Sequence, residues 1–232
     1  MTFLLLLTLL QTSDTIDVDY GDPNFFTYPD SIAYQIRTDL NDGFYRAYGT
    51  LRNGEKYLRF SGALLDHQRT GSWRFYTQPQ YAQGSYLQHE EVFDQGDWVE
   101  TTSYYENGKK EDRLIYAPKS KHQSDWTEMR RWHRNGQLSI RVFIPEGASR
   151  YKQEGYYETG ELHYEGYFDR HERTTGTWTY FHKNGTIAKQ GKYCNKCLNK
   201  GVRAIFYGIP RGTWNYYDEQ GNLIQSKKQR HR

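Results

Sequence analysis

The sequence has few of the features that mark common functional classes. Its 232 residues include two cysteines, whereas a structural zinc site normally takes four ligands. The formal net charge of +3 lacks the strong basic bias that is typical of nucleic-acid-binding proteins. The Gly-x-Ser-x-Gly, Walker and dinucleotide-binding motifs are missing as well. These absences favour a protein that is not an enzyme, has no cofactor and does not bind nucleic acid.

Long apolar runs are also scarce, and the one apolar run lies at the N-terminus. Residues 3–10 consist mainly of leucine, and this run is too short to span a bilayer. It suits the apolar stretch of a secretory signal, with Thr12 or Ser13 at the cleavage site, although no Lys or Arg precedes it. We therefore expect residues 1–13 to be a signal segment and the protein to be periplasmic, outer-membrane-associated or extracellular. The alternative is a buried N-terminal segment.

Aliphatic residues are few, whereas aromatic residues are abundant. Phe, Trp and Tyr make up 17% of the chain, which is nearly half of its 36% hydrophobic content. Aromatic side chains favour strands because flat rings cover a pleated surface well. Tyr and Trp also suit thin sheets, where the ring is buried and the polar atom reaches water. The composition predicts an all-β protein with little or no helix.

A glycine preceded by Asn or another polar residue recurs along the chain, with a period of about 25 residues. Asn-Gly between alternating apolar runs predicts a hairpin with a two-residue type I′ turn, in which both residues need φ > 0. At residues 184–185 such a turn pairs Tyr180 with Lys189 and Trp178 with Gly191, leaving room for the Trp178 indole over the glycine. The turn signals are Asn53-Gly54, Asn107-Gly108, Asn135-Gly136, Thr159-Gly160, Asn184-Gly185 and Gln220-Gly221.

Opposite charges flank some of these turns. A two-residue turn pairs Arg52 with Glu55 and Glu106 with Lys109, and such pairs favour the register. The Thr159-Gly160 turn would face Glu158 with Glu161, which indicates a longer turn there.

A second signal, Gly-x-Trp-x-aromatic-aromatic, runs in phase with the turns. It occurs at residues 71–76, 176–181 and 212–217, and Trp98 and Trp126 mark weaker copies. The residues that we predict to carry the repeat are Trp73, Asn107, Gly108, Trp126, Asn135, Gly136, Gly160, Trp178, Tyr180, Asn184, Gly185, Trp214, Tyr216 and Gly221.

The repeats must stack to be stable. One hairpin of about 24 residues buries too little apolar surface to offset its conformational entropy, so neighbouring units must cover one another. We therefore predict an extended, twisted antiparallel meander of about seven stacked β-hairpin repeats over residues 45–226. Residues 14–44 form an N-terminal linker or cap, in which residues 31–40 are a candidate first strand, and residues 227–232 form a basic, frayed tail.

The repeat resembles a known family. Gly-x-Trp-x-Tyr-aromatic, then polar-Asn-Gly, a short strand and a closing Gly-x-Tyr are clearest at residues 176–193, with Gly191-Lys192-Tyr193 at the end. This pattern resembles the bacterial variant of the MORN repeat, the group known as YwqK-like antitoxins, over about residues 45–226. The resemblance implies a β-hairpin array that serves as a scaffold, a protein-binding surface or a lipid-associated module. The antitoxin group would imply a toxin as the partner.

The pair Cys194-x-x-Cys197 is the sharpest local motif. In an exported protein we expect an intramolecular disulfide that closes an inserted loop. A free pair, half of a metal site and a redox-active pair remain as alternatives, although a redox site of the thioredoxin type needs a βαβ context.

Candidate acid and base residues are weak. Glu158 and Glu161 flank an exposed turn, which gives no reason for a shifted pKa. The segment His89-Glu90-Glu91-Val92-Phe93 has Phe where a zinc motif needs a second His. We therefore predict no catalytic residue and no metal site.

The aromatic residues have two interpretations. Trp73, Trp178 and Trp214 suit a core packed repeat on repeat. A sheet of one layer has two faces, however, and there are too few aliphatic residues to bury both, so some of the 22 Tyr should stay accessible. Tyr and Trp are enriched at interfaces. We therefore expect a non-enzymatic scaffold that binds a protein through its open, aromatic-rich sheet. A cytoplasmic toxin-binding protein, a cell-surface carbohydrate-binding module and a membrane-surface partner are the alternatives.

Overall fold

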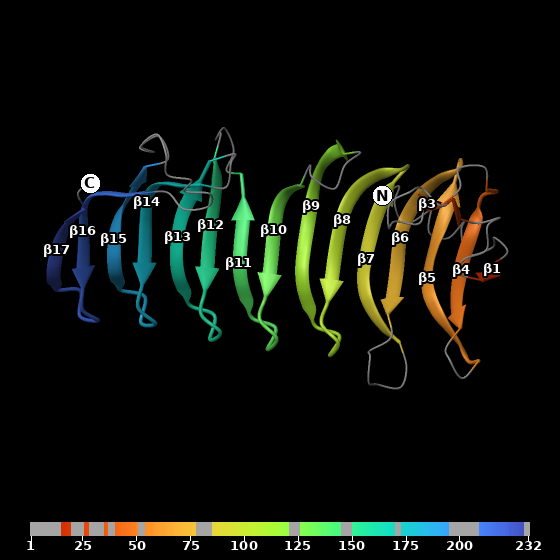
Figure 1. The fold of residues 1–232 in the computed structure, drawn as a ribbon, viewed down its shortest axis with the longest axis horizontal. Helices are drawn as coiled ribbons and strands as arrows, with labels where there is room; N and C mark the ends of the chain where they lie inside the picture. The colour runs from red at the N-terminus through yellow and green to blue at the C-terminus, as the bar shows by residue number, and fades with distance from the viewer. Residues whose placement is uncertain are drawn as a thin grey trace, which may run out of the picture. The chain divides into compact units, whose positions relative to one another are not determined.

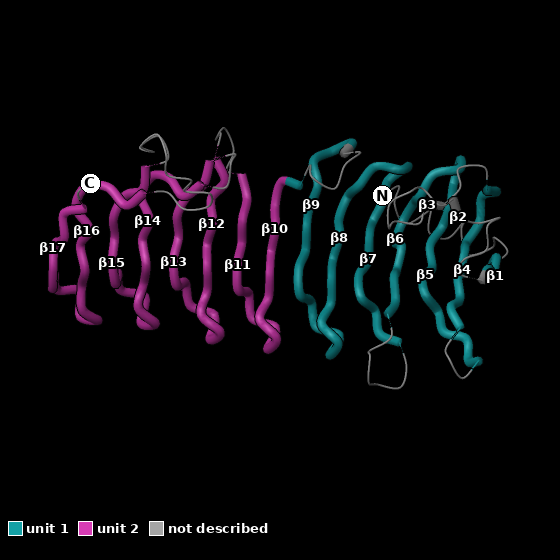
Figure 2. The backbone as a smooth tube through the Cα atoms, viewed as in Figure 1, with its two compact units in different colours: residues 1–126 teal, residues 127–232 magenta. Residues whose placement is uncertain are grey.

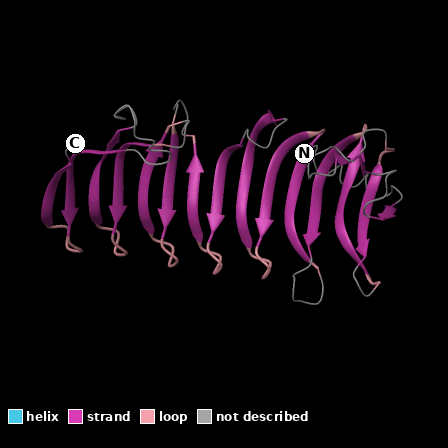
Figure 3. Cartoon of the chain, in the orientation of Figure 1, coloured by secondary structure: helices cyan, strands magenta, loops and turns pink. Residues whose placement is uncertain are grey.

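The computed structural model describes residues 15–19, 26–27, 35–36, 40–50, 54–77, 85–120, 126–144, 150–169, 173–194 and 209–229. These residues form strands, turns and short loops, and none of them is helical (Figure 3). Among them, no helix is long and apolar enough to cross a membrane. The chain divides into two compact units, unit 1 (residues 1–126) and unit 2 (residues 127–232), which Figure 2 shows in different colours.

Unit 1 is a sheet in which strands that follow one another in sequence lie side by side, in the order β1-β4-β5-β6-β7-β8-β9 (Figure 1). Its pairs are antiparallel from β4 to β9, whereas β1 pairs parallel with β4. A separate antiparallel pair is formed by β2 and β3. The strands are β1 (Thr15–Asp19), β2 (Phe26–Thr27), β3 (Gln35–Ile36), β4 (Gly43–Thr50), β5 (Lys56–Leu65), β6 (Gln68–Thr77), β7 (Tyr86–Asp94), β8 (Asp97–Tyr104) and β9 (Lys110–Ser120).

Unit 2 is an antiparallel meander in which each strand pairs with the next, from β10 to β17. Its strands are β10 (Trp126–Trp132), β11 (Leu138–Phe143), β12 (Tyr151–Tyr156), β13 (Leu162–Phe168), β14 (Thr174–Phe181), β15 (Ile187–Cys194), β16 (Ile209–Tyr217) and β17 (Leu223–Gln229).

The predicted all-β meander of antiparallel hairpins is confirmed in each unit. The parallel β1–β4 pair is the exception, and residues 20–42 provide the long connection that a parallel pair needs. In the predicted linker, Thr15–Asp19 forms this added strand and Gln35–Ile36 a short one. The last strand runs to Gln229, so Lys227 and Lys228 of the predicted frayed tail are paired residues of β17. Residues 1–13 lie outside the described residues.

Where the structure describes them, the polar-Gly turns are not the predicted two-residue type I′ turns, and Asn53 of the first one lies outside the described residues. At Asn184-Gly185 the backbone N–H of Gly185 donates to the carbonyl of His182 (2.9 Å), and the N–H of His182 donates to the carbonyl of Thr186 (2.8 Å). The loop therefore has three residues, of which Gly185 alone has a positive φ, at +84°. This geometry is a type I turn followed by a glycine bulge. It recurs where Gly108, Gly136, Gly160 and Gly221 close the loop.

The three-residue loop corrects some predicted pairs and preserves others. The backbone N–H of Tyr105 donates to the carbonyl of Lys109, so the predicted Glu106–Lys109 pair is wrong. The longer turn expected at Thr159-Gly160 is present. A bulge between Tyr180 and Phe181 absorbs the extra residue, so Tyr180 still pairs with Lys189 as predicted. The predicted Arg52–Glu55 pair involves residues outside those described.

Two type I′ turns do occur in unit 1, at the strand ends opposite to those that carry the polar-Gly turns. Asp66 and His67 join β5 to β6 with φ of 50° and 59°. Gln95 and Gly96 join β7 to β8 with φ of 49° and 81°. These turns place consecutive hairpins of unit 1 directly next to each other.

Each Gly-x-Trp segment forms the same bulge. In β14 three residues, Gly176 to Trp178, lie opposite the single residue Gly166, and the ladder resumes on either side. Residues 71–73 lie opposite Gly62 in the same way, and residues 212–214 lie opposite Gly191. Each of the three Gly-x-Trp glycines has a φ between 62° and 69°. The repeat therefore needs glycine at both sides of the bulge.

The indole of each repeat lies on a glycine of the preceding strand. A Cβ on Gly166 would come within 2.1 Å of the Trp178 ring, and a Cβ on Gly191 within 2.1 Å of the Trp214 ring. The prediction that Gly191 accommodates Trp178 is thus wrong, although their Cα atoms are paired. The bulge directs each indole backward, onto the glycine that faces it. The indole N–H of Trp178 donates to the carbonyl of Tyr167 (3.2 Å).

Candidate interaction surface

Unit 2 presents an aromatic row on one face of its sheet. Alternation along paired strands places these rings on the same side, and the three-residue bulge keeps the tryptophans in line with them. Ring centroids lie 5.1 Å apart for Tyr193–Trp214 and 5.9 Å for Tyr164–Trp178. We call this row the aromatic face. It consists of Tyr164, Phe168, Trp178, Tyr180, Tyr193, Trp214 and Tyr216.

On the aromatic face, the tryptophans are more deeply buried than the tyrosines. Trp178 and Trp214 are 5% and 3% exposed, whereas Tyr164, Tyr193 and Tyr216 are half-buried. The described strands of unit 2 all belong to one sheet, so among them no second layer covers these rings. The tryptophans therefore act as the packed centre of the row, and the tyrosines form its accessible surface.

Among the tyrosines of the aromatic face, Tyr180 has the largest shift in pKa. Burial and a hydrogen bond with Tyr193 raise its pKa, so its hydroxyl stays protonated. The ammonium of Lys189 lies 4.1 Å from the centroid of the Tyr180 ring, in a cation–π contact. The face thus combines apolar rings, hydroxyl groups and a cation.

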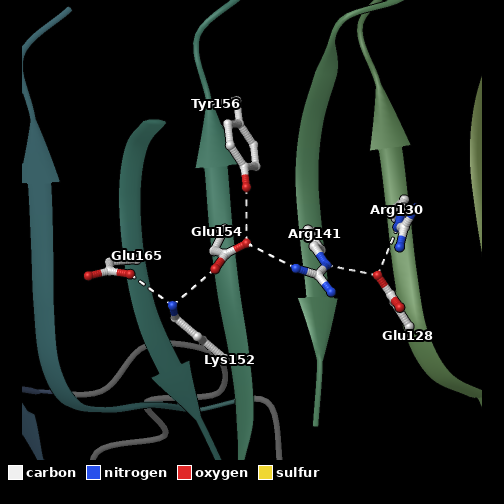
Figure 4. Close-up of polar contacts among 7 residues, drawn as sticks. All are labelled: Glu128, Arg130, Arg141, Lys152, Glu154, Tyr156 and Glu165. Carbon is white, nitrogen blue, oxygen red and sulfur yellow. Dashed lines mark hydrogen bonds and ion pairs between the residues drawn. The ribbon is translucent and has the colours of Figure 1, made fainter. Parts of the chain in front are cut away.

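The opposite face of unit 2 carries a row of alternating charges (Figure 4). Glu128 accepts hydrogen bonds from Arg130 and Arg141, at 2.8 Å each. The next carboxylate along, that of Glu154, lies 3.7 Å from Arg141 and 3.0 Å from Lys152. We call this row the polar ladder. It consists of Glu128, Arg130, Arg141, Lys152, Glu154, Tyr156 and Glu165.

The charges of the polar ladder compensate one another. Burial tends to raise the pKa of Glu128, but the hydrogen bonds from its two arginines lower that pKa overall. Likewise, hydrogen bonds to Glu165 and Glu154 outweigh the effect of burial and raise the pKa of Lys152. Three carboxylates face three cations, so this row forms neither a basic nor an acidic patch.

Unit 1 contains a buried carboxylate that sequence reasoning missed. Glu91 is 6% exposed, and burial raises its pKa to about 7 in spite of the nearby Arg69. The guanidinium of Arg69 lies 3.2 Å from the carboxylate and 5.3 Å from the centroids of the Trp73 and Phe93 rings. Nε2 of His89 lies 3.7 Å from the same carboxylate. The alternation of His89, Glu91 and Phe93 along β7 is the signal that could have placed Glu91 inside.

The Glu91 cluster does not form a metal site with its neighbours. Burial lowers the pKa of His89, whose ring stacks on Phe75 with centroids 4.4 Å apart. In the part of the chain that the structure describes, no three His, Cys, Asp or Glu residues are grouped as metal ligands. Hydrogen bonding within the Thr159 turn lowers the pKa of the exposed Glu161, which makes it a weaker base.

The predicted repeat residues occupy recurring places in the structure. Asn107, Asn135 and Asn184 precede the turn glycines, and the side-chain oxygen of each accepts a hydrogen bond from the backbone two residues on. Trp73 is fully buried in unit 1, and Trp126 is half-buried at the start of β10. Cys194 ends β15 and is disulfide-bonded. Cys197 lies outside the described residues, so its pairing with Cys194 stays a prediction.

Neighbouring turns in unit 2 are also joined to each other. His182 Nε2 lies 3.0 Å from the carbonyl oxygen of Tyr217, and the side-chain amide of Asn184 donates to the carbonyl of Glu219 (2.8 Å). His133 and Asn135 make the same contacts with Tyr156 and Glu158. The recurring His-x-Asn-Gly segment therefore connects one repeat to the next as well as forming its own turn.

One of these hairpins matches a known family. Residues 174–195 match the MORN repeat variant. The MORN repeat variant match spans β14, the three-residue loop and β15, so it contains the Gly-x-Trp bulge and the turn described above. The predicted resemblance is confirmed for this repeat, and the matched repeat and the hairpin meander fit a repeat scaffold. The finer assignment to YwqK-like antitoxins stays a prediction. No curated protein matches the chain.

Proposed function

We propose that the protein is a non-enzymatic repeat scaffold that binds another protein through the aromatic face of unit 2. The observation that carries the proposal is the half-buried row of tyrosines beside buried tryptophans, in a sheet of one layer. Such rings offer large contact area with little conformational entropy to lose, which is why Tyr is enriched at interfaces.

Capture from the native host with a tagged protein tests this proposal. We expect one protein to be recovered repeatedly by the wild type and to fall at least about tenfold with Tyr193→Ser and Tyr216→Ser together, since aromatic anchors dominate interfaces. Gln190→Ala, on the opposite face of the same strand β15, is the matched control and should capture normally. Equal recovery by the tyrosine variant would contradict the role of the aromatic face. Retention on insoluble cell-wall polysaccharide at moderate salt would favour a carbohydrate-binding module instead.

We also propose that the protein is exported. The apolar residues 3–10 followed by Thr12 and Ser13 support this proposal. Mass spectrometry of the mature N-terminus in protein from the native host should find a start after about residue 13. An intact Met1 would instead favour the cytoplasmic, toxin-binding alternative.

A further inference from the structure

The charge of the chain is distributed unevenly, which the net value conceals. Twelve of its 31 Lys and Arg residues lie in residues 173–232, together with only two of its 28 Asp and Glu residues. This C-terminal segment therefore has a formal charge of +10, and the rest of the chain −7, although the sum is +3. Strands β14 to β17 belong to the basic segment.

Within the described residues, the exposed lysines at the end of unit 2 lack the carboxylate partners that the cations of the polar ladder have. Lys192 of β15 lies directly opposite Arg211 of β16, and both residues are exposed. Like charges in such a cross-strand pair are destabilising. On β17, Lys227 lies opposite Trp214 and Lys228 opposite Thr213, and both lysines are exposed. None of the three lysines contacts a carboxylate within the described residues, in contrast to Lys152 of the ladder.

Among the described strands, β17 also lies at an edge of the sheet. Among the described residues it pairs only with β16, so the backbone donors and acceptors of its other side are open to a further strand. Its side chains are exposed from Leu223 to Lys228, and the exposed fractions of Leu223 and Ile224 reach 58% and 67%. Addition of an extended peptide to such an edge is a common mode of recognition.

We propose that Lys227 and Lys228 of β17, here called the basic end, bind an acidic extended segment of a partner protein that adds as a strand along β17, while Lys192 and Arg211 add positive charge on the strands before it. Successive side chains of an added strand point to opposite faces of the sheet. Acidic residues of the partner thereby reach Lys227 on the aromatic face and Lys228 on the polar face.

The geometry favours a peptide over a nucleic acid as the partner. A phosphate backbone would contact the lysines of one face, whereas Lys227 and Lys228 lie on opposite faces at an edge that offers backbone hydrogen bonds. The proposal rests on the proposed function in taking the partner to be a protein, but it uses a surface other than the half-buried tyrosines.

Binding of a short labelled peptide in which pairs of adjacent glutamates alternate with pairs of valines, so that glutamate side chains point to both faces of the sheet, tests the proposal by fluorescence anisotropy at low salt. We expect saturable binding that weakens as salt is added, and a loss of affinity of about tenfold or more with Lys227→Gln and Lys228→Gln together. The matched control is Lys109→Gln with Lys110→Gln, an exposed adjacent pair in unit 1, which should change affinity less than about twofold.

Two further peptides separate charge from strand pairing. A version with glutamine in place of glutamate should bind at least about tenfold more weakly, and one with a central proline, which keeps the charge but interrupts pairing, should also bind more weakly. Equal binding of either peptide, or unchanged binding by the Lys227/Lys228 variant, would overturn the proposal. Tighter binding of duplex DNA with the same dependence on these lysines would assign the basic end to nucleic acid.

The aromatic-face variant distinguishes this proposal from the proposed function. Tyr193→Ser with Tyr216→Ser should bind the acidic peptide normally. Suppose that this variant loses capture of the native partner and that the wild-type protein does not bind the acidic peptide. The scaffold role of the aromatic face would then be retained, and the proposed role of the basic end would be refuted.

Discussion

Units 1 and 2 are built from similar hairpins, but the side chains of these hairpins are buried more fully in unit 1 than in unit 2. Unit 1 has a cluster of six buried residues, to which Ile16 and Val18 of the parallel strand β1 add cover. The cluster consists of Tyr45, Ala47, Phe60, Leu64, Trp73 and Phe93. In unit 2 the buried apolar residues are Val142, Trp178 and Trp214, and their aromatic neighbours stay half-exposed.

The difference follows from chain connections and strand length. In unit 1 the two type I′ turns join successive hairpins directly, and strands β5 and β6 are each 10 residues long. In unit 2 strands β11 and β12 have 6 residues each. Longer, directly joined strands bring more side chains over one another. The same Gly-x-Trp device therefore builds a closed core in unit 1 and leaves an accessible aromatic row in unit 2.

The largest expected effect on this comparison comes from adding a methyl group beneath the indole, by replacing a glycine with alanine in each unit. Cβ atoms on Gly62 and on Gly166 would each come within 2.1 Å of an indole, that of Trp73 or Trp178. Gly62→Ala should cost about 4 kcal/mol, because Trp73 is fully enclosed, whereas Gly166→Ala should cost about 2 kcal/mol, because half-exposed neighbours can move. Urea denaturation, with unfolding monitored by hydrogen exchange in each unit, would measure both losses of stability.

The exposed Thr177→Ala is the control for these glycine variants and should change stability by less than about 0.5 kcal/mol. Equal losses for Gly62→Ala and Gly166→Ala would show that the two units enclose their tryptophans equally well.

One carboxylate in each unit should give the two units opposite responses to pH. Glu91 of unit 1 has a pKa raised to about 7 by burial. Its folded form holds a proton that the unfolded chain releases near pH 4.5, so its contribution to stability falls between about pH 4.5 and 7, by about 3 kcal/mol. Glu91→Gln should remove this decline. His89, whose pKa burial lowers, acts in the opposite direction, so the comparison is wild type against Glu91→Gln.

In unit 2 the sign is reversed. The pKa of Glu128 is lowered by its arginines, so its contribution is present above about pH 4.5 and is lost as the pH falls through the folded pKa. Hydrogen exchange resolved by unit, measured from acidic to neutral pH, would check both. A pH profile of Glu91→Gln that parallels the wild type in unit 1 would refute the role of Glu91.

The sequence predicts the hairpins well because their signals are local. Polar-Gly and Gly-x-Trp require backbone conformations that few other residues adopt, so both mark real turns and bulges. The Tyr180–Lys189 pair could be predicted even from the wrong turn type, because the bulge before Phe181 restores the register. By contrast, the Asp66-His67 turn contains neither Asn nor Gly and gave no signal.

Features that depend on distant residues could not be predicted in this way. Which indole lies on Gly191 depends on the bulge in the next strand, beyond the hairpin that contains the glycine. The burial of Glu91 depends on Arg69 and on rings from β6 and β7. The basic C-terminal segment does not show in the net charge of +3, because the acidic remainder of the chain offsets it.

Exchanging the turn residue should give the smallest effect and the sharpest test of the two turn types. Gln95 has a φ of 49° in the type I′ turn of unit 1, where Asn is the preferred residue. Gln95→Asn should stabilise the protein by about 0.5–1 kcal/mol, measured from the urea midpoint. In the three-residue loop of unit 2, Gln220 has no positive φ, and Asp218 already accepts the backbone N–H of Asn222 (2.7 Å). Gln220→Asn therefore gains neither a relaxed backbone nor a new hydrogen bond, and should change stability by less than about 0.3 kcal/mol. Equal stabilisation at both positions would mean that the left-handed conformation of Gln95 is not what separates the two turns.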